Sequence, residues 1–450
     1  MSTTLATQTT DNSDVSSSSP SNSCELTYGQ LLFCSAAIGI AGGLVATIYY
    51  YVLESSMHLV WQTLPNVLAP YLPAGSSWNY LWLTTTIGGF LVGLTLYFMG
   101  LPGEVALVVD KVHDPGKIEL RQTPAMIVAS LLSITAGGSA GPEAPLVQIN
   151  GSLGGWLGDK LKLTTATIRV LTFCGMSAAL GAFFGAPLGG ALFALEIPHR
   201  RGLEYYEAIV PAVLSAILSF SVFRLSTGLT IGGMYHFASI PKLSLIHLLQ
   251  GASLGVVGAL VAIVFILIFQ GIGHLTEYIA HRIILLATLG GLSIGLIALA
   301  FPQTLFFGEK EIDTIVETGS TFGIVMLLMI VLAKMLATSC TLHSGFRGGF
   351  IFPLFYIGAA MGLAISLAVP SIHPTIGMIC MMAAVNVAVT KTPLSTTVIL
   401  SVLSDTAMVP VIVIASFVSF VLTTQVSLIK TQRPRNTSLE AENGVSIGTA

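Results

Sequence analysis

Two nine-residue stretches, GPEAPLVQI (141–149) and GFIFPLFYI (349–357), share the pattern G-x-x-x-P-L-x-x-I. A second motif follows each of them, GAPLGGALFALE (185–196) in one case and KTPLSTTVILSVL (391–403) in the other. The motif prolines are 42 residues apart in the first set and 40 in the second. Two motifs that recur in the same order at matched spacing indicate an internal duplication.

The duplication predicts two homologous halves, at about residues 30–225 and 240–428. Duplicated membrane folds commonly place their site at the midplane, where the halves meet and where helices are discontinuous. We therefore expect two inverted-topology halves with the four motif prolines near the midplane.

Composition defines the class of protein. Of the 450 residues, 53% are hydrophobic and 9% are charged, whereas soluble proteins carry about 25% charged residues. The 46 glycines and 20 prolines favour tilted and broken helices, because irregular backbone at membrane depth is tolerated where protein or a cavity covers it. We predict an all-α integral membrane protein surrounded by lipid. The net charge of −3 gives no reason to expect a nucleic-acid partner.

The G-x-x-x-P pattern is a helix-start motif. Proline is tolerated in the first helical turn, and glycine before it lets the chain turn and lets backbone approach a ligand. A helix N-terminus presents unpaired N–H groups and about half a positive charge. Four such starts aimed at one point would bind a small anion such as chloride without a metal or a cofactor.

Glu143 lies inside the first motif. A carboxylate near a helix N-terminus gains about 0.3–1 kcal/mol, whereas an acidic residue at bilayer depth costs about 2.5–3.5 kcal/mol. A capping role therefore does not offset the cost. We predict a gate, in which the charged carboxylate competes with the anion for the helix ends and protonation releases it.

These residues carry a family resemblance. Over about residues 30–428 the chain resembles the CLC family of chloride channels and chloride/proton antiporters. Gly141-Pro142-Glu143-Ala144-Pro145 is similar to the family's G-[KR]-E-G-P, and FFGAPLGGALFALE to its FNAPLAGILFxxE. The resemblance implies a CLC-like inverted repeat, a homodimer with one pore per subunit, and Glu143 as the gate. The anion-binding positions that it implies are Met99, Gly100, Pro102, Gly141, Pro142, Gly349, Phe350 and Ile351.

The chain departs from the family pattern at several positions. Met99 replaces the filter serine, or Pro102 does if the alignment slides by three residues, and Ile351 replaces the filter phenylalanine. No tyrosine follows Tyr356, so the pore tyrosine has no counterpart. These departures favour a voltage- or pH-dependent chloride channel over the alternative, a chloride/proton antiporter. The residue that follows Glu196 favours the channel too.

Glu196 is followed by Ile197, where many antiporters of the family have a second glutamate. Glu196 is a candidate for a proton path, although an ion pair with Arg200 or Arg201 is the stronger interpretation. Arg347, two residues before Gly349, either concentrates anions at a pore mouth or is a plain surface base.

The two ends of the chain are polar. Residues 1–28 predict a disordered tail, and 429–450 predict a short tail without a regulatory domain. The bases that follow the last apolar stretch, Lys430, Arg433 and Arg435, predict a cytoplasmic C-terminus. We expect the protein in the plasma membrane.

Two rival classes remain open. GGSAG (137–141) matches the G-x-S-x-G elbow of serine hydrolases around Ser139, but that motif requires a strand–turn–helix context. A secondary transporter of an organic solute would require polar side chains, whereas the repeated motifs offer mostly backbone. We therefore do not expect an enzyme.

Overall fold

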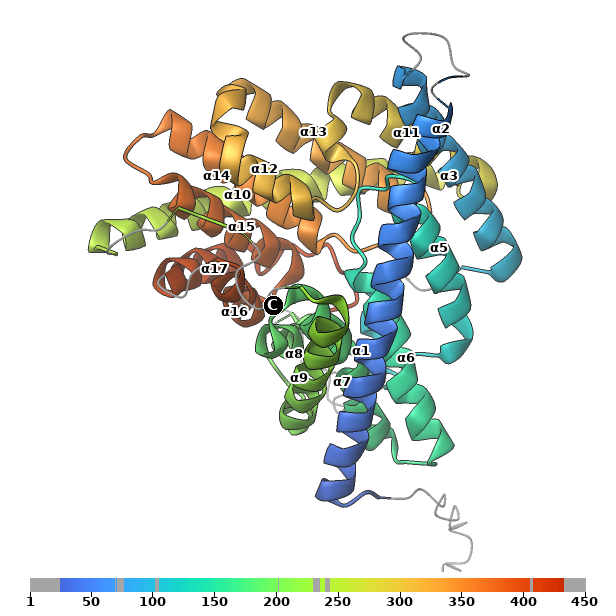
Figure 1. Cartoon of the computed structure of the whole chain (residues 1–450). Coiled ribbons are helices and arrows are strands. Elements are labelled where there is room, and N and C mark those ends of the chain that lie inside the picture. Colours follow the sequence, from blue (N-terminus) through green and yellow to red (C-terminus); the bar gives the residue numbers. More distant parts are fainter. Residues whose placement is uncertain are drawn as a thin grey trace, which may run out of the picture.

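The computed structural model describes residues 25–68, 70, 77–101, 105–200, 202–229, 235–238, 243–404 and 408–432. These residues form helices joined by short turns, and no β-sheet occurs among them (Figure 1). Most of the two predicted polar tails, at 1–24 and 433–450, falls outside the described residues.

The helices fall into two sets that follow the duplication. The first set is α1 (Tyr28–His58), α2 (Leu64–Leu68), α3 (Ser77–Met99), α4 (Val105–His113), α5 (Thr123–Thr135), α6 (Glu143–Lys160), α7 (Thr165–Phe184), α8 (Pro187–Glu196) and α9 (Ile209–Thr227). The second set is α10 (Leu245–Glu277), α11 (Ile283–Ala300), α12 (Glu309–Thr318), α13 (Gly323–His343), α14 (Ile351–Ala368), α15 (Pro374–Thr390), α16 (Pro393–Leu403) and α17 (Val409–Thr423).

The two sets pack in the same way. Helix α6 packs on α7 as α14 packs on α15, and α1 packs on α9 as α10 packs on α17. Across the boundary, α3 lies against α11 and α8 lies against α16, so equivalent helices of the two sets meet each other. The arrangement is the inverted repeat that the paired motifs predict.

The motifs act as helix starts. Helix α6 begins at Glu143 and α14 begins at Ile351, so Pro145 and Pro353 both lie in the first turn. Helices α8 and α16 begin at their motif prolines. Proline fits these positions because the first N–H groups of a helix have no partner within it.

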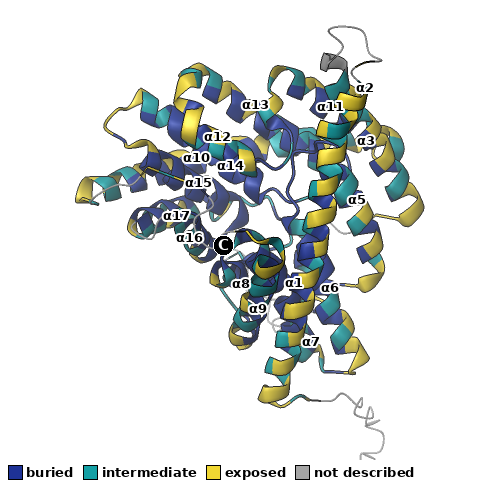
Figure 2. Ribbon diagram, viewed as in Figure 1, coloured by how far each residue is buried: buried dark blue, intermediate teal, exposed yellow. Residues whose placement is uncertain are grey.

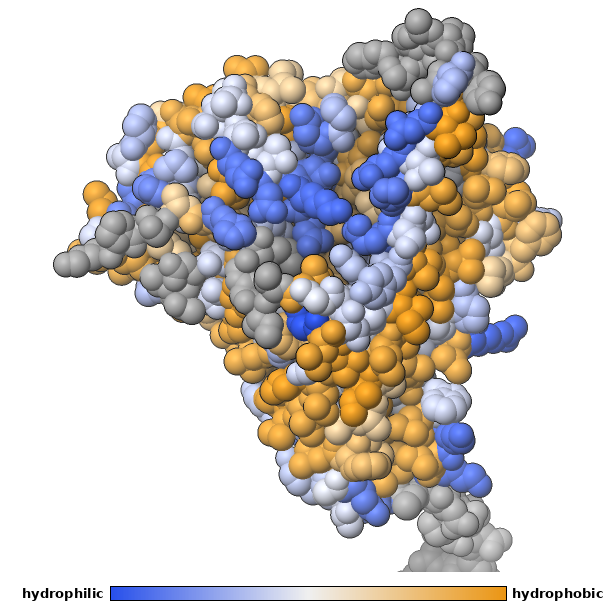
Figure 3. Space-filling model, in the orientation of Figure 1, coloured by the Kyte–Doolittle hydropathy of each residue, from blue (hydrophilic) through white to orange (hydrophobic). Residues whose placement is uncertain are grey.

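The apolar surface is that of a membrane protein. Eight helical segments of the described residues are long and apolar enough to cross a membrane. Exposed side chains on α1 include Phe33 and Ile48, and hydrophobic residues cover much of the face shown in Figure 3. By contrast, α7 and α15 lie inside the protein and are largely buried (Figure 2). The chain is therefore a multi-pass integral membrane protein.

Small residues allow the inner helices to approach closely. A Cβ added at Gly181 of α7 would collide with Ala216 of α9, and one at Gly189 of α8 would collide with Ile399 of α16. Gly185 ends α7 with a φ of 65°, which favours glycine. This row of glycines therefore serves packing within one chain.

Candidate anion site at the meeting of the two halves

The centre of the site is a pairing between equivalent residues of the repeat. The Gly141 N–H donates to the Gly349 carbonyl at 2.8 Å, and the Gly349 N–H donates to the Gly141 carbonyl at 2.7 Å. The antiparallel pairing joins the two G-x-x-x-P motifs immediately before α6 and α14. It fixes the two helix starts relative to each other.

The Glu143 side chain lies in the cradle that these glycines form. It is 1% exposed, and its Oε1 accepts the Ile351 N–H at 2.9 Å. A Cβ added at Gly141 or Gly349 would overlap the carboxylate. Its second oxygen, Oε2, has no hydrogen-bond partner among the residues that the structure describes. One oxygen is thus held by the start of α14, and the other is not held.

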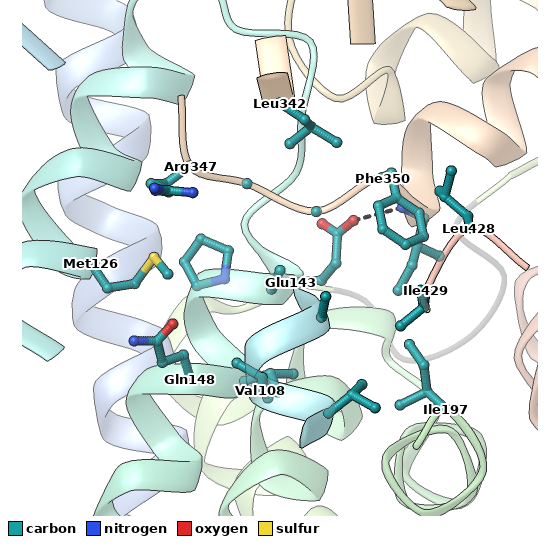
Figure 4. Close-up of a pocket in the computed structure, with 18 of the residues that line it drawn as sticks. Val108, Met126, Glu143, Gln148, Ile197, Leu342, Arg347, Phe350, Leu428 and Ile429 are labelled. Carbon is teal, nitrogen blue, oxygen red and sulfur yellow. Dashed lines mark hydrogen bonds between the residues drawn. The ribbon is translucent and has the colours of Figure 1, made fainter. Parts of the chain in front are cut away.

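A cavity of about 190 Å³ borders the carboxylate (Figure 4). Its lining is mostly apolar, and its polar side chains are Glu143, Gln148, His343 and Arg347. The remaining lining residues are Ala106, Val108, Val109, Met126, Ala144, Pro145, Val147, Met176, Leu180, Phe193, Ile197, Phe269, Leu342, Phe346, Gly348, Gly349, Phe350, Ile351, Leu428 and Ile429. The cavity is large enough for a small anion with part of its hydration shell.

Most predicted anion-binding residues meet here. Gly349, Phe350 and Ile351 line the cavity, and Gly141 is paired with Gly349. Pro142 precedes the first helical residue of α6 and faces away, into a small pocket beside Tyr49. The binding role of all these residues stays a prediction.

The described part of the first filter segment, through Leu101, does not line this cavity. Met99 is the last residue of α3 and is 46% exposed, and neither Met99 nor Gly100 lines the cavity. Pro102 lies outside the described residues. The expected contribution of Met99 and Gly100 is therefore not seen, because α3 continues through Met99 to an exposed end. The following helix, α4, lines the cavity instead, through Ala106, Val108 and Val109.

Glu196 binds the start of α16, and its predicted place on a proton path stays a prediction. Its carboxylate accepts the Leu394 N–H at 3.1 Å, the Ser395 N–H at 2.8 Å and the Ser395 Oγ–H at 2.6 Å. It therefore caps α16. No ion pair with Arg200 forms, because the helix start supplies the partners, and Arg201, the other predicted partner, lies outside the described residues. Glu196 does not line the cavity, whereas Ile197 does.

The predicted polar tail begins too early in the sequence. Ile429 is buried and lines the cavity together with Leu428. Gln432 is also buried, and its Nε2 donates to the carbonyls of Ile197 and Thr390 at 2.8 and 2.7 Å. Residues 429–432 therefore belong to the packed domain, because these contacts hold them there.

Other candidates are placed clearly. Arg347 is 5% exposed and lines the cavity, so the surface-base interpretation is wrong. Ser139 lies between two helices, with its Oγ 3.1 Å from Thr338 Oγ1, and so lacks the context of a hydrolase elbow. Lys391, the first residue of the motif KTPLSTTVILSVL, ends α15, and its Nζ donates to the Thr423 carbonyl at 2.6 Å.

Comparison with known proteins assigns this architecture. The family model described as "Voltage gated chloride channel" matches residues 88–424, about three quarters of the chain. The chain belongs to this family. The CLC relatives include a chloride/fluoride channel protein of Pseudomonas syringae pv. tomato, 30% identical over 363 residues, which cover 78% of each chain. A putative ion-transport protein, YfeO, of Escherichia coli is 25% identical over 411 residues, covering 89% of this chain and 94% of that one.

Solved structures share the CLC fold. A CLC-type fluoride/proton antiporter superposes with a TM-score of 0.75 at 22% identity, covering 91% of this chain and all of that one. A slow cyanobacterial Cl⁻/H⁺ antiporter gives a TM-score of 0.77 at 20% identity, covering 93% and 99%. At these identities the likeness shows the fold alone. The shared fold and the family match together show that this chain carries out CLC-type anion transport.

Proposed function

We propose that this protein is a channel for small anions, chloride and fluoride among them, that is gated by Glu143. The observation that carries the proposal is the hydrogen bond from the Ile351 N–H to the Glu143 carboxylate. It puts the negative charge of the side chain at the start of α14, where a transported anion would gain the same interaction. Side chain and anion therefore compete for one place.

Gating then follows from charge. The ionised carboxylate is attracted to the partial positive charge at the start of α14, which is about half an elementary charge. A proton on Glu143 removes this attraction, and the side chain leaves the cradle of Gly141 and Gly349. The Ile351 N–H then donates to the anion. Partial charges bind the anion weakly enough for release, as conduction requires.

The cavity favours a channel over the alternative, an antiporter. Among the described residues, Glu143 is the one carboxylate that lines it. Ile197, Leu428 and Ile429 give apolar walls, and an apolar wall does not bind and release protons. The position after Glu196, where many antiporters of the family have a second glutamate, is therefore apolar in this chain. The name of the Pseudomonas syringae relative, a chloride/fluoride channel protein, also supports a channel and both anions.

The assembly and its location are part of the proposal. We propose a homodimer in the plasma membrane with one pore per subunit and the C-terminus in the cytoplasm. The family resemblance supports the dimer. The bases that follow the last apolar stretch support the orientation.

Reversal potentials in liposomes under opposed chloride and proton gradients test the proposal. The expected result for the wild-type protein is a potential set by the anion gradient alone, with no uphill proton movement. A chloride gradient that drove sustained proton pumping, abolished by Glu143→Gln, would establish the antiporter. The same assay with fluoride replacing chloride measures the preference between the two anions.

A further inference from the structure

The turn between α6 and α7 carries a lysine in a conformation that favours glycine. Helix α6 ends in a Schellman motif, in which the Lys162 N–H donates to the Asp159 carbonyl at 3.1 Å. The Leu163 N–H completes the motif by donating to the Gly158 carbonyl at 3.0 Å. Lys162 takes the left-handed position, with a φ of 52°. Glycine usually occupies this position, because a Cβ disfavours the left-handed conformation. Lysine here therefore costs stability that glycine would not.

The Lys162 side chain has no role inside the protein that offsets this cost. Lys160 and Lys162 are both exposed, and neither ammonium forms a hydrogen bond or an ion pair with the described residues. Lys391 is also left-handed, with a φ of 63°, but its Nζ donates to the Thr423 carbonyl and Oγ1 at 2.6 and 2.9 Å. The ammonium of Lys162, unlike that of Lys391, is therefore available to a group from outside the chain.

Two apolar side chains lie beside the two lysines. The Trp156 ring is 44% exposed, and the Lys160 Nζ lies 4.9 Å from its centroid. Leu161, between the lysines in sequence, is 42% exposed. Tryptophan is enriched where lipid headgroups meet water, because its ring is apolar and its N–H is polar. Exposed apolar side chains next to unpaired ammonium groups match a lipid, which offers both acyl chains and a charged headgroup.

The charges around the turn indicate the leaflet that it faces. Lys117 pairs with Asp159 at 2.7 Å, so residues 111–121 lie against residues 159–169. These two segments contain six of the 18 lysines and arginines of the chain. In Figure 3, hydrophilic residues at the lower end of the view border a broad hydrophobic surface, and α6 ends at this lower end in Figure 1. Basic residues mark the cytoplasmic side, where anionic phospholipids attract them.

We propose that Trp156, Lys160, Leu161 and Lys162 form a binding site for an anionic phospholipid of the cytoplasmic leaflet. The two ammonium groups donate to the phosphate oxygens, and Trp156 and Leu161 contact the upper part of the acyl chains. A zwitterionic lipid gains less, because its own cation is repelled by both lysines. The site is independent of the proposed gate, since Glu143 lies at the other end of α6.

Quenching of tryptophan fluorescence by brominated lipids tests the site. Full-length protein is reconstituted in phosphatidylcholine vesicles that contain brominated phosphatidylglycerol or brominated phosphatidylcholine as a minor component. The chain has four tryptophans, so the Trp156 signal is the difference between each protein and its Trp156→Phe counterpart. Half-quenching should require at least about tenfold less brominated phosphatidylglycerol than brominated phosphatidylcholine. Lys160→Gln and Lys162→Gly should each reduce this preference about fivefold.

The control variants separate lipid binding from folding. Glycine suits the left-handed position, so Lys162→Gly should keep or raise the midpoint of thermal unfolding while it loses lipid preference. Lys162→Arg retains the charge and should retain the preference. Lys310→Gln removes an exposed base of α12, at the opposite end of the molecule from the α6–α7 turn, and should leave the preference unchanged (Figure 1).

Three outcomes would overturn the proposal. The first is equal quenching of Trp156 by the two brominated lipids in the wild-type protein. The second is a preference that survives Lys160→Gln and Lys162→Gly combined. The third is loss of the preference when inorganic phosphate is added but not when sodium chloride is added at the same ionic strength, which would show that the lysines bind free phosphate. We expect phosphate and chloride to act alike, because neither has acyl chains to contact Trp156 and Leu161.

Discussion

Two carboxylates of the first half each reach the start of a helix in the second half, and they differ in how completely they are held. Glu196 accepts three hydrogen bonds at the start of α16, shared between both of its oxygens. Glu143 accepts the Ile351 N–H at the start of α14 through Oε1, while its Oε2 has no partner among the described residues. Both side chains are 1% exposed, so burial does not distinguish them.

The difference lies in the surroundings. The Glu196 carboxylate is enclosed and caps a helix that has to stay in place. The Glu143 carboxylate borders a cavity of about 190 Å³ and is cradled by two glycines that carry no side chain to hold it. A carboxylate that is fully hydrogen-bonded stabilises the fold, whereas one that is half bonded beside a cavity is free to move.

The largest expected effect concerns pH. Wild-type anion flux should rise as external pH falls, by up to about tenfold per pH unit, which is the limit for a single proton. Glu143→Gln should make the flux independent of pH, because the side chain can no longer become charged. Glu196→Gln is the matched variant and should keep the pH dependence. Anion flux from liposomes across a pH series measures both variants. A pH-dependent flux in Glu143→Gln would refute the gating role of Glu143.

The next effect concerns the donor at the start of α14. Ile351→Pro removes the N–H that holds Glu143, while proline remains acceptable at the first position of a helix. Chloride binding in the Glu143→Gln background should weaken at least about tenfold. Ile351→Phe keeps the N–H and should bind chloride as before. Calorimetric titration with chloride compares the two, and equal behaviour would show that the backbone donor is not the ligand.

A third prediction concerns stability. Glu196→Ala leaves the N–H groups of Leu394 and Ser395 without their acceptor, and should lower the free energy of unfolding by about 3 kcal/mol. Glu143→Ala should change it by less than about 1 kcal/mol, since it removes one hydrogen bond and also a buried charge. Unfolding in mixed micelles measures both variants. Equal losses would remove the distinction between a fixed and a movable carboxylate.

The smallest effect concerns one hydroxyl. Ser395→Ala removes the 2.6 Å hydrogen bond from Oγ to Glu196 and leaves the two backbone donors in place. The expected loss is about 1 kcal/mol. Ser401→Ala is the control, because the Ser401 Oγ donates to the Val398 carbonyl of its own helix, and it should have almost no effect. A loss at Ser401 as large as that at Ser395 would count against the capping role of Glu196.

The sequence by itself determined the class, the inverted repeat and the helix starts. Hydropathy follows directly from composition, and G-x-x-x-P acts locally, because the conformations of glycine and proline are properties of single residues. The sequence also indicated a functional role for Glu143, because placing a carboxylate in an apolar membrane segment costs free energy.

Only the tertiary structure decided which groups meet. Gly141 pairs with Gly349, and Glu143 with Ile351, across about 200 residues of chain, and no local pattern specifies such contacts. The same holds for Glu196, whose partners on α16 replace the nearby arginine that sequence proximity favours. Gln148 likewise lines the cavity because of the way α6 packs. Hydrogen-bond partners depend on how helices pack, and packing brings together residues that the order of the chain keeps apart.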